Sequence, residues 1–142
     1  MTAPAIATPV SASARPRSRA SGSVITGRVL SGIAIAFLAV DAFFKIFPVQ
    51  AVIEGSAQLG YPLETMLPIG ITLMSCVILY AIPTTSVFGA LLLTGYMGGA
   101  IATHVRVENP LFSHILFPTY VAALIWGGLY LRNAKLRALV AG

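Results

Sequence analysis

Charged residues are scarce in this sequence: Asp, Glu, Lys and Arg together make up 9% of its 142 residues, against 57% for the AVILMFWYC set. Soluble domains carry roughly 25% charged residues. A water-soluble fold of this size could not cover its surface with nine basic and four acidic side chains. The composition therefore excludes a soluble enzyme, a disordered chain and a disulfide scaffold, and the length allows one domain.

The chain also lacks the usual chemical motifs. Its only cysteine, Cys76, lies in an apolar run, so neither an internal disulfide nor a CxxC pair can form. The two histidines, His104 and His114, have no carboxylate or cysteine at a metal-ligand spacing. There is no Gly-rich phosphate loop, no Ser-His-Asp pattern and no aromatic-basic patch for nucleic acid. We therefore expect no metal, no cofactor and no nucleic-acid partner, and we do not expect a stand-alone enzyme.

No acidic residue precedes Asp41, and sixteen of the first 23 residues are Ala, Ser, Pro or Thr. Such a segment buries too little apolar surface to offset the entropy of the chain. Residues 1–23 are therefore predicted to form a disordered cytoplasmic tail, and residues 24–142 a four-span membrane domain. An organellar transit peptide has a similar composition and is the alternative interpretation of the first segment.

Four apolar segments, each 17 to 24 residues long, follow the tail. A helix rises about 1.5 Å per residue, so about 20 residues cross a hydrocarbon core of about 30 Å. The chain is therefore predicted to be an all-α integral membrane protein, a four-helix bundle. The predicted spans are residues 24–47, 65–82, 87–105 and 115–131.

The link between the first two spans is predicted to contain a short amphipathic helix, because apolar residues recur at helical spacing from Val49 to Ala57. Gly60 can end this helix in the left-handed conformation, and Pro62 prevents its continuation. The helix either lies on the outer membrane interface, with Tyr61 at headgroup depth, or packs on the bundle as an ordinary connector.

The basic residues are distributed unevenly between the two sides of the membrane. Four spans place both termini on one side, and seven of the nine basic residues lie there, whereas all four acids lie on the other side. Because cytoplasmic ends carry an excess of Lys and Arg, both termini are predicted to be cytoplasmic. The seven bases are Arg15, Arg17, Arg19, Arg28, Arg132, Lys135 and Arg137, and the four acids are Asp41, Glu54, Glu64 and Glu108.

Small residues follow two ridges of the third span. Such ridges let a neighbouring backbone approach closely, which favours helix association in lipid. The interpretation is either packing inside the monomer, with Ala123 and Gly127 of the fourth span as the receiving surface, or a homodimer seam. The first ridge contains Ala90, Thr94, Gly98 and Ala102, and the second contains Gly95, Gly99 and Thr103.

A polar cluster is predicted near the outer ends of the first and third spans. Asp41 and Lys45 are four residues apart, so they share a helix face and can pair. The third span runs in the same direction and brings His104 and Arg106 to similar depth; His114, on the next link, is a further candidate. Ionisable groups within spans are costly and often mark functional sites. These residues form a predicted ligand-binding or polar cluster, unless the long side chains only snorkel to the interface and Asp41 only neutralises Lys45.

Several motifs occur together between residues 27 and 138. They are Lys45, Leu59-Gly60-Tyr61-Pro62, Ile82-Pro83, the run of residues 89–96 with Gly98-Gly99-Ala100 and His104, the run of residues 109–114, Pro118, and Gly128-Leu129-Tyr130-Leu131-Arg132. With these motifs the chain resembles the DoxX-like family of small four-span bacterial membrane proteins. The resemblance implies a four-helix bundle in a bacterial inner membrane. Relatives often carry a glutamate where this chain has Leu73, so a role that needs that carboxylate is not implied.

The family's namesake is associated with a thiosulfate–quinone oxidoreductase as its small subunit. The resemblance therefore implies an accessory or small-ligand binding subunit of a membrane redox system, with a quinone or a sulfur compound as ligand. The alternatives are a small anion carrier that uses Lys45, His104 and Arg106, and a purely structural partner of another membrane protein. Carriers usually have internal repeats and broken helices, and neither is evident. We expect contact with the lipid bilayer and with another membrane protein or a second copy of the chain.

Overall fold

The computed structural model describes residues 22–142, and within them it contains helices and no strand. The all-α prediction is therefore confirmed. The predicted tail falls on residues 1–21, which lie outside the described residues, and on the first two residues of α1. The elements are α1 (Gly22–Ile46), α2 (Gln50–Gln58), the 3-10 turn η1 (Leu63–Thr65), α3 (Met66–Ala81), α4 (Ser86–Arg106), the π-helical turn η2 (Leu111–Ile115), α5 (Phe117–Arg132) and α6 (Ala134–Ala141).

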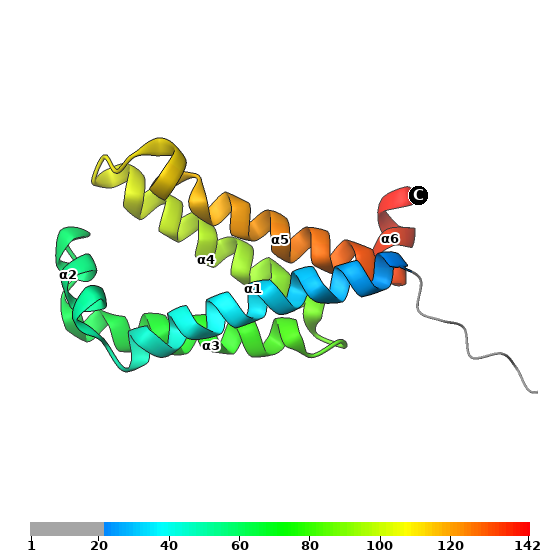
Figure 1. Cartoon of the computed structure of the whole chain (residues 1–142), viewed down its shortest axis with the longest axis horizontal. Helices are drawn as coiled ribbons and strands as arrows, with labels where there is room; N and C mark the ends of the chain where they lie inside the picture. Colours follow the sequence, from blue (N-terminus) through cyan, green and yellow to red (C-terminus); the bar gives the residue numbers. More distant parts are fainter. Residues whose placement is uncertain (1–21) are drawn as a thin grey trace, which may run out of the picture.

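The four long helices form the predicted bundle. Helix α1 packs against α3 and α5, and α4 packs against the same two helices, so α1 and α4 lie on one diagonal. The pair α1/α3 and the pair α4/α5 lie close together at the end where α1 begins and α6 lies, and they diverge toward α2 (Figure 1). We call the first end the terminal end and the opposite one the α2 end.

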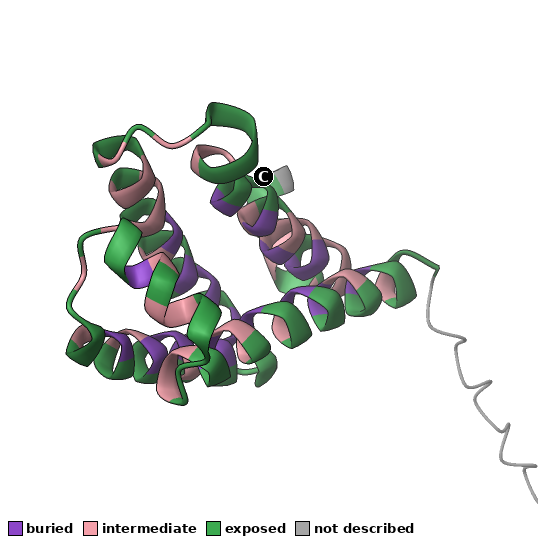
Figure 2. Cartoon of the chain, turned by 60° about the vertical axis from the view of Figure 1, so that its left-hand side comes forward, coloured by how far each residue is buried: buried purple, intermediate pink, exposed green. Residues whose placement is uncertain are grey.

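Within residues 22–142, four helical segments are long and apolar enough to cross a membrane, with 19 to 25 residues and mean hydropathies of 1.4 to 2.0. Their outward faces carry large exposed apolar side chains such as Ile33, Phe43, Ile71 and Leu91. Buried residues lie on the faces that the helices turn toward one another (Figure 2). Apolar surface on all sides of a bundle requires lipid around it, so the bundle is built to contact the bilayer. The segments are Gly22–Ile46, Leu63–Ala81, Ser86–Arg106 and Leu111–Arg132.

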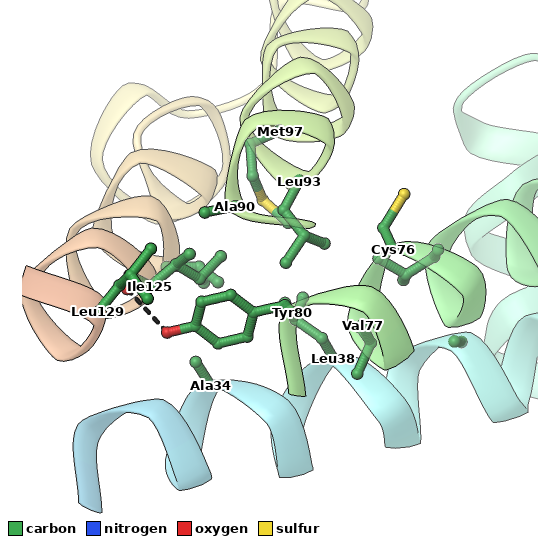
Figure 3. Close-up of a cluster of buried hydrophobic side chains, with 13 residues drawn as sticks. Ala34, Leu38, Cys76, Val77, Tyr80, Ala90, Leu93, Met97, Ile125 and Leu129 are labelled. Atoms are coloured by element: carbon green, nitrogen blue, oxygen red, sulfur yellow. Dashed lines mark hydrogen bonds between the residues drawn. The ribbon is translucent and has the colours of Figure 1, made fainter. Parts of the chain in front are cut away.

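Tyr80 of α3 lies at the centre of the core, near the terminal end, with none of its surface exposed. Its hydroxyl donates to the Ile125 carbonyl oxygen at 2.8 Å (Figure 3). The same hydroxyl lies 2.9 Å from Ser31 Oγ. Because the phenol has one hydrogen, the Ser31 hydroxyl donates in the second bond. Arg132 of α5 donates to the Tyr80 carbonyl oxygen at 3.1 Å. Tyr80 thus joins α3 to α1 and α5, and its hydroxyl is fully satisfied.

Helix backbones approach closely at glycines in this same region. A Cβ atom added to Gly89 would lie 2.3 Å from the Tyr80 backbone nitrogen, and one added to Gly128 would lie 2.6 Å from Ser31 Oγ. At Gly27 the nearest atom, the Arg132 backbone nitrogen, would be 2.7 Å away. Only glycine fits such contacts, so these positions fix the α3–α4 and α1–α5 contacts.

The small-residue ridges of α4 do not all pack as predicted. Ala90 is buried, and Thr94 accepts a hydrogen bond from Trp126 of α5 at 2.9 Å. The glycines of the ridges, however, meet no atom within 4 Å of an added Cβ, and neither does Gly127 of the proposed receiving surface. Packing inside the monomer is therefore confirmed for Ala90 and Thr94 and is wrong for these glycines, because the buried face of α4 is that of Ala90, Leu93 and Met97. The open glycines are Gly95, Gly98 and Gly99.

The predicted link helix is present as α2, although it begins at Gln50 after an extended Val49. Gly60 has a φ of +73°, as predicted. The Gly60 and Tyr61 amides donate to the carbonyl oxygens of Ala57 and Ser56, at 3.0 and 2.9 Å. This pair of bonds is a Schellman motif, and it ends α2 and turns the chain toward α3.

Helix α6 was not predicted. Asn133, in an extended conformation, interrupts the helix after Arg132, and its side-chain oxygen accepts from the Lys135 and Leu136 amides at 3.0 and 3.1 Å. Asparagine is a strong N-cap, so Asn133 was the available signal.

Candidate functional site

A cavity of about 510 Å³ lies between the diverging helix pairs at the α2 end. Apolar side chains from α1, α3, α4 and α5 form most of its wall, and a few polar groups face it. Concave, mostly apolar sites with a few polar groups are typical of small-molecule binding. The cavity is lined by Phe37, Leu38, Asp41, Lys45, Val52, Gly55, Ser56, Leu59, Tyr61, Met66, Ile69, Tyr96, Met97, Gly99, Ala100, Thr103, His104, Phe117, Pro118 and Val121.

Asp41 and Lys45 both line this cavity, and their predicted pairing is confirmed. Lys45 Nζ lies 2.5 Å from Asp41 Oδ1, and the two side chains are 20% and 38% exposed, respectively. Within residues 22–142 this is the only ion pair. An unpaired charge at this depth would be costly, so the pair presents to the cavity a polar surface with no net charge.

His104 also lines the cavity, from α4, whereas the ion pair lies on α1. Its Nδ1 lies 2.7 Å from the Asn109 amide nitrogen. That nitrogen can only donate, so Nδ1 accepts, and in the neutral ring the proton sits on Nε2. His104 therefore has a donor available for a ligand. The ring of His114 lies edge-on to it at 5.7 Å, but His114 does not line the cavity.

Arg106, the fourth predicted member of the cluster, does not line the cavity. Its Nη2 donates to the Leu59 carbonyl oxygen at 2.5 Å, and its guanidinium lies 5.9 Å from the centre of the Tyr61 ring. Because Arg106 is the last residue of α4, its side chain reaches across to the turn that follows α2. Its observed contacts tie α4 to this turn, whereas Asp41, Lys45 and His104 share the cavity.

Four further polar side chains line the cavity, and sequence reasoning missed them as site residues: Ser56, Tyr61, Tyr96 and Thr103. The Tyr61 hydroxyl lies 2.9 Å from Thr103 Oγ1, which itself donates to the Gly99 carbonyl oxygen at 3.0 Å. Tyr61 is therefore the donor, and it is turned toward α4. Tyr96 lies two turns before His104 on α4. The spacing of Tyr96, Thr103 and His104, seven and eight residues, places them on one helix face, and that spacing was the available signal.

The helices and their apolar outer faces define an integral membrane protein of the four-helix-bundle class. Within the described residues no group of three His, Cys, Asp or Glu side chains could hold a metal ion.

A family model, that of the DoxX-like family, matches residues 29–128, which is 100 of the 142 residues. The chain belongs to the DoxX-like family, as the motifs in its sequence indicated. Every residue that lines the cavity falls within the matched stretch. No curated protein and no solved structure matches the chain.

Proposed function

We propose that this protein is an accessory subunit of a redox system in a bacterial inner membrane, and that its cavity binds the headgroup of a quinone. The observation that carries the proposal is the cavity itself: about 510 Å³ at the level of the membrane, with mostly apolar walls and a small set of polar groups. A ligand that is apolar but has a few hydrogen-bonding atoms suits such a wall.

A quinone headgroup has this chemistry, because its flat ring carries two carbonyl oxygens that accept hydrogen bonds. The His104 Nε2–H and the Lys45 ammonium are donors on opposite helices of the bundle diagonal. Phe37 of α1 and Phe117 of α5 line the cavity and contact each other edge-on, with ring centres 5.6 Å apart. Both side chains are also partly exposed, by 46% and 43% of their surface. An isoprenoid tail would therefore leave the cavity between α1 and α5 and enter the lipid.

A sulfur oxyanion fits the same groups less well. Asp41 neutralises Lys45, and Arg106, which donates to the Leu59 carbonyl oxygen, does not line the cavity. An anion in the cavity would lie close to the Asp41 carboxylate without an unpaired cation to offset it. For the same reason we do not favour an anion carrier.

The orientation is part of the proposal. The basic residues at the terminal end favour cytoplasmic termini, which places the cavity on the periplasmic side of the membrane. The redox partner would be another membrane protein, and mass spectrometry of proteins that co-purify in mild detergent would identify it.

The proposal is tested by titrating the purified protein in detergent with a short-tailed ubiquinone and measuring heat of binding. His104→Ala should weaken binding about two- to tenfold, because a hydrogen bond in a site contributes about 0.5–1.5 kcal/mol. Thermal unfolding of the variant should remain unchanged. The matched control is His114→Ala, which removes the same side chain from a position outside the cavity and should bind as the wild type does.

Two outcomes contradict the proposal. One is the absence of quinone binding by the wild-type protein, and the other is equal loss of binding in both histidine variants. Thiosulfate is titrated in parallel, and binding of thiosulfate that depends on Lys45, without quinone binding, would favour a sulfur compound instead.

A further inference from the structure

A second hollow, which we call the basic groove, lies at the terminal end of the bundle. It has a volume of about 610 Å³ and runs between the α3–α4 turn and the break from α5 to α6. The turn contributes Thr84 and Ser86, and the break contributes Arg132, Lys135 and Leu139. We propose that this groove binds the phosphate headgroup of an anionic phospholipid.

The charge of the groove is not balanced within the protein. Arg132 and Lys135 line it, and all four acidic residues of the sequence lie on the α2 end, between Asp41 and Glu108. The only ion pair of the described residues is the one between Asp41 and Lys45. Basic pockets at a membrane surface attract anionic headgroups for this reason, so an anionic headgroup suits the groove as a counterion.

Arg132 is held in place before any ligand arrives. Its guanidinium lies 5.0 Å from the centre of the Tyr80 ring and donates to the Tyr80 carbonyl oxygen at 3.1 Å. Its Nε is buried and makes no hydrogen bond within the described part of the chain. Because Nε is buried, only the terminal Nη1 and Nη2 groups can meet a ligand. A guanidinium has five N–H donors and the bond to Tyr80 uses one of them, and phosphate oxygens are strong acceptors for the others.

The remaining wall of the groove favours a lipid over free phosphate. Leu139 lines the groove with 80% of its surface exposed, and Val140 beside it is 66% exposed. Helix α6, which carries both, follows α5 at the terminal end of the bundle (Figure 1). When a short helix lies at a membrane surface, its exposed apolar side chains insert among the acyl chains of the lipids. The groove thus offers donors to a headgroup and an apolar wall to the chains attached to it.

The test uses the full chain in detergent, titrated with dioleoylphosphatidylglycerol or with dioleoylphosphatidylcholine, and bound lipid is counted by native mass spectrometry. The acyl chains are identical, so the difference reports the headgroup. Because Arg132 also packs on Tyr80, the tested change is Lys135→Gln, at an exposed position. It should reduce the affinity for phosphatidylglycerol about fivefold, the effect of one basic residue near an anionic surface. The control Arg28→Gln removes the same charge from an exposed position that does not line the groove.

The proposal is supported if phosphatidylglycerol binds more tightly than phosphatidylcholine and only Lys135→Gln weakens it. Equal losses in Lys135→Gln and Arg28→Gln would show general surface attraction and overturn the site. No loss in Lys135→Gln, or no preference for the anionic lipid, would overturn it as well. Inorganic phosphate in large excess should displace little lipid; full displacement would assign the groove to free phosphate and refute the lipid.

Discussion

Replacing either Asp41 or Lys45 with an uncharged residue is expected to destabilise the bundle, and the two replacements should differ in cost. Exposed ion pairs contribute about 0.2–1 kcal/mol, whereas breaking a buried pair costs about 3–5 kcal/mol. With side chains 20% and 38% exposed, this pair lies between these limits, and we expect roughly 1–2 kcal/mol for a single replacement. Asp41→Asn should cost more than Lys45→Met, because it leaves the less exposed partner, Lys45, without a counterion.

The double variant should recover most of this loss, since removing both charges leaves none unpaired. The assay is thermal or denaturant unfolding in detergent of the wild type, the two single variants and the double variant. The pair Gln50 and Glu54 on α2 has the same four-residue spacing and a 2.8 Å hydrogen bond, but is exposed, so Glu54→Gln should have no measurable effect. A coupling energy within error of zero between Asp41 and Lys45 would show that both side chains are solvated, and the reasoning would fail.

Three shorter predictions concern the core and the topology. Gly89→Ala should abolish or strongly weaken folding, because the added Cβ would lie 2.3 Å from the Tyr80 backbone nitrogen. The control Gly98→Ala adds its Cβ in open space. In thermal unfolding in the same detergent, this control should behave like the wild type. Tyr80→Phe should lower the free energy of unfolding by about 1–2 kcal/mol, because the Ile125 carbonyl and Ser31 lose their partner; an unchanged midpoint would contradict this. Reporter fusions after Gly142 and between residues 109 and 113 should give opposite signals, and a periplasmic signal from the C-terminal fusion would refute the proposed orientation.

What the sequence predicted correctly depends on local spacing. The four spans follow from the length of the apolar runs, and the Asp41–Lys45 contact follows from a separation of one helical turn. The positive φ of Gly60 follows because a helix often ends at a glycine in the left-handed conformation. Each of these is decided within a few residues of the chain.

What the sequence did not predict depends on how helices face one another. The glycines of α4 have the spacing of a packing ridge, yet Leu93 and Met97 on another face of the helix enter the core, and nothing local decides between these faces. The cavity likewise arises from the divergence of two helix pairs, so no single segment encodes it. Tyr61 illustrates the same point, since only the turn after α2 directs its hydroxyl to Thr103.

The position of Tyr80 has a consequence for how this protein can change. Its hydrogen bonds and the close contact at Gly89 lie at the opposite end of the bundle from the cavity. Substitutions in the cavity wall therefore leave these contacts in place, although Leu38, Met97 and Val121 belong both to that wall and to the core. Proteins usually lose stability when they acquire new binding properties, but here the hydrogen bonds of Tyr80 and the close contact at Gly89 involve no residue of the cavity wall. A scaffold of this kind can exchange one small ligand for another with little loss of stability, so close relatives in fold need not share a ligand.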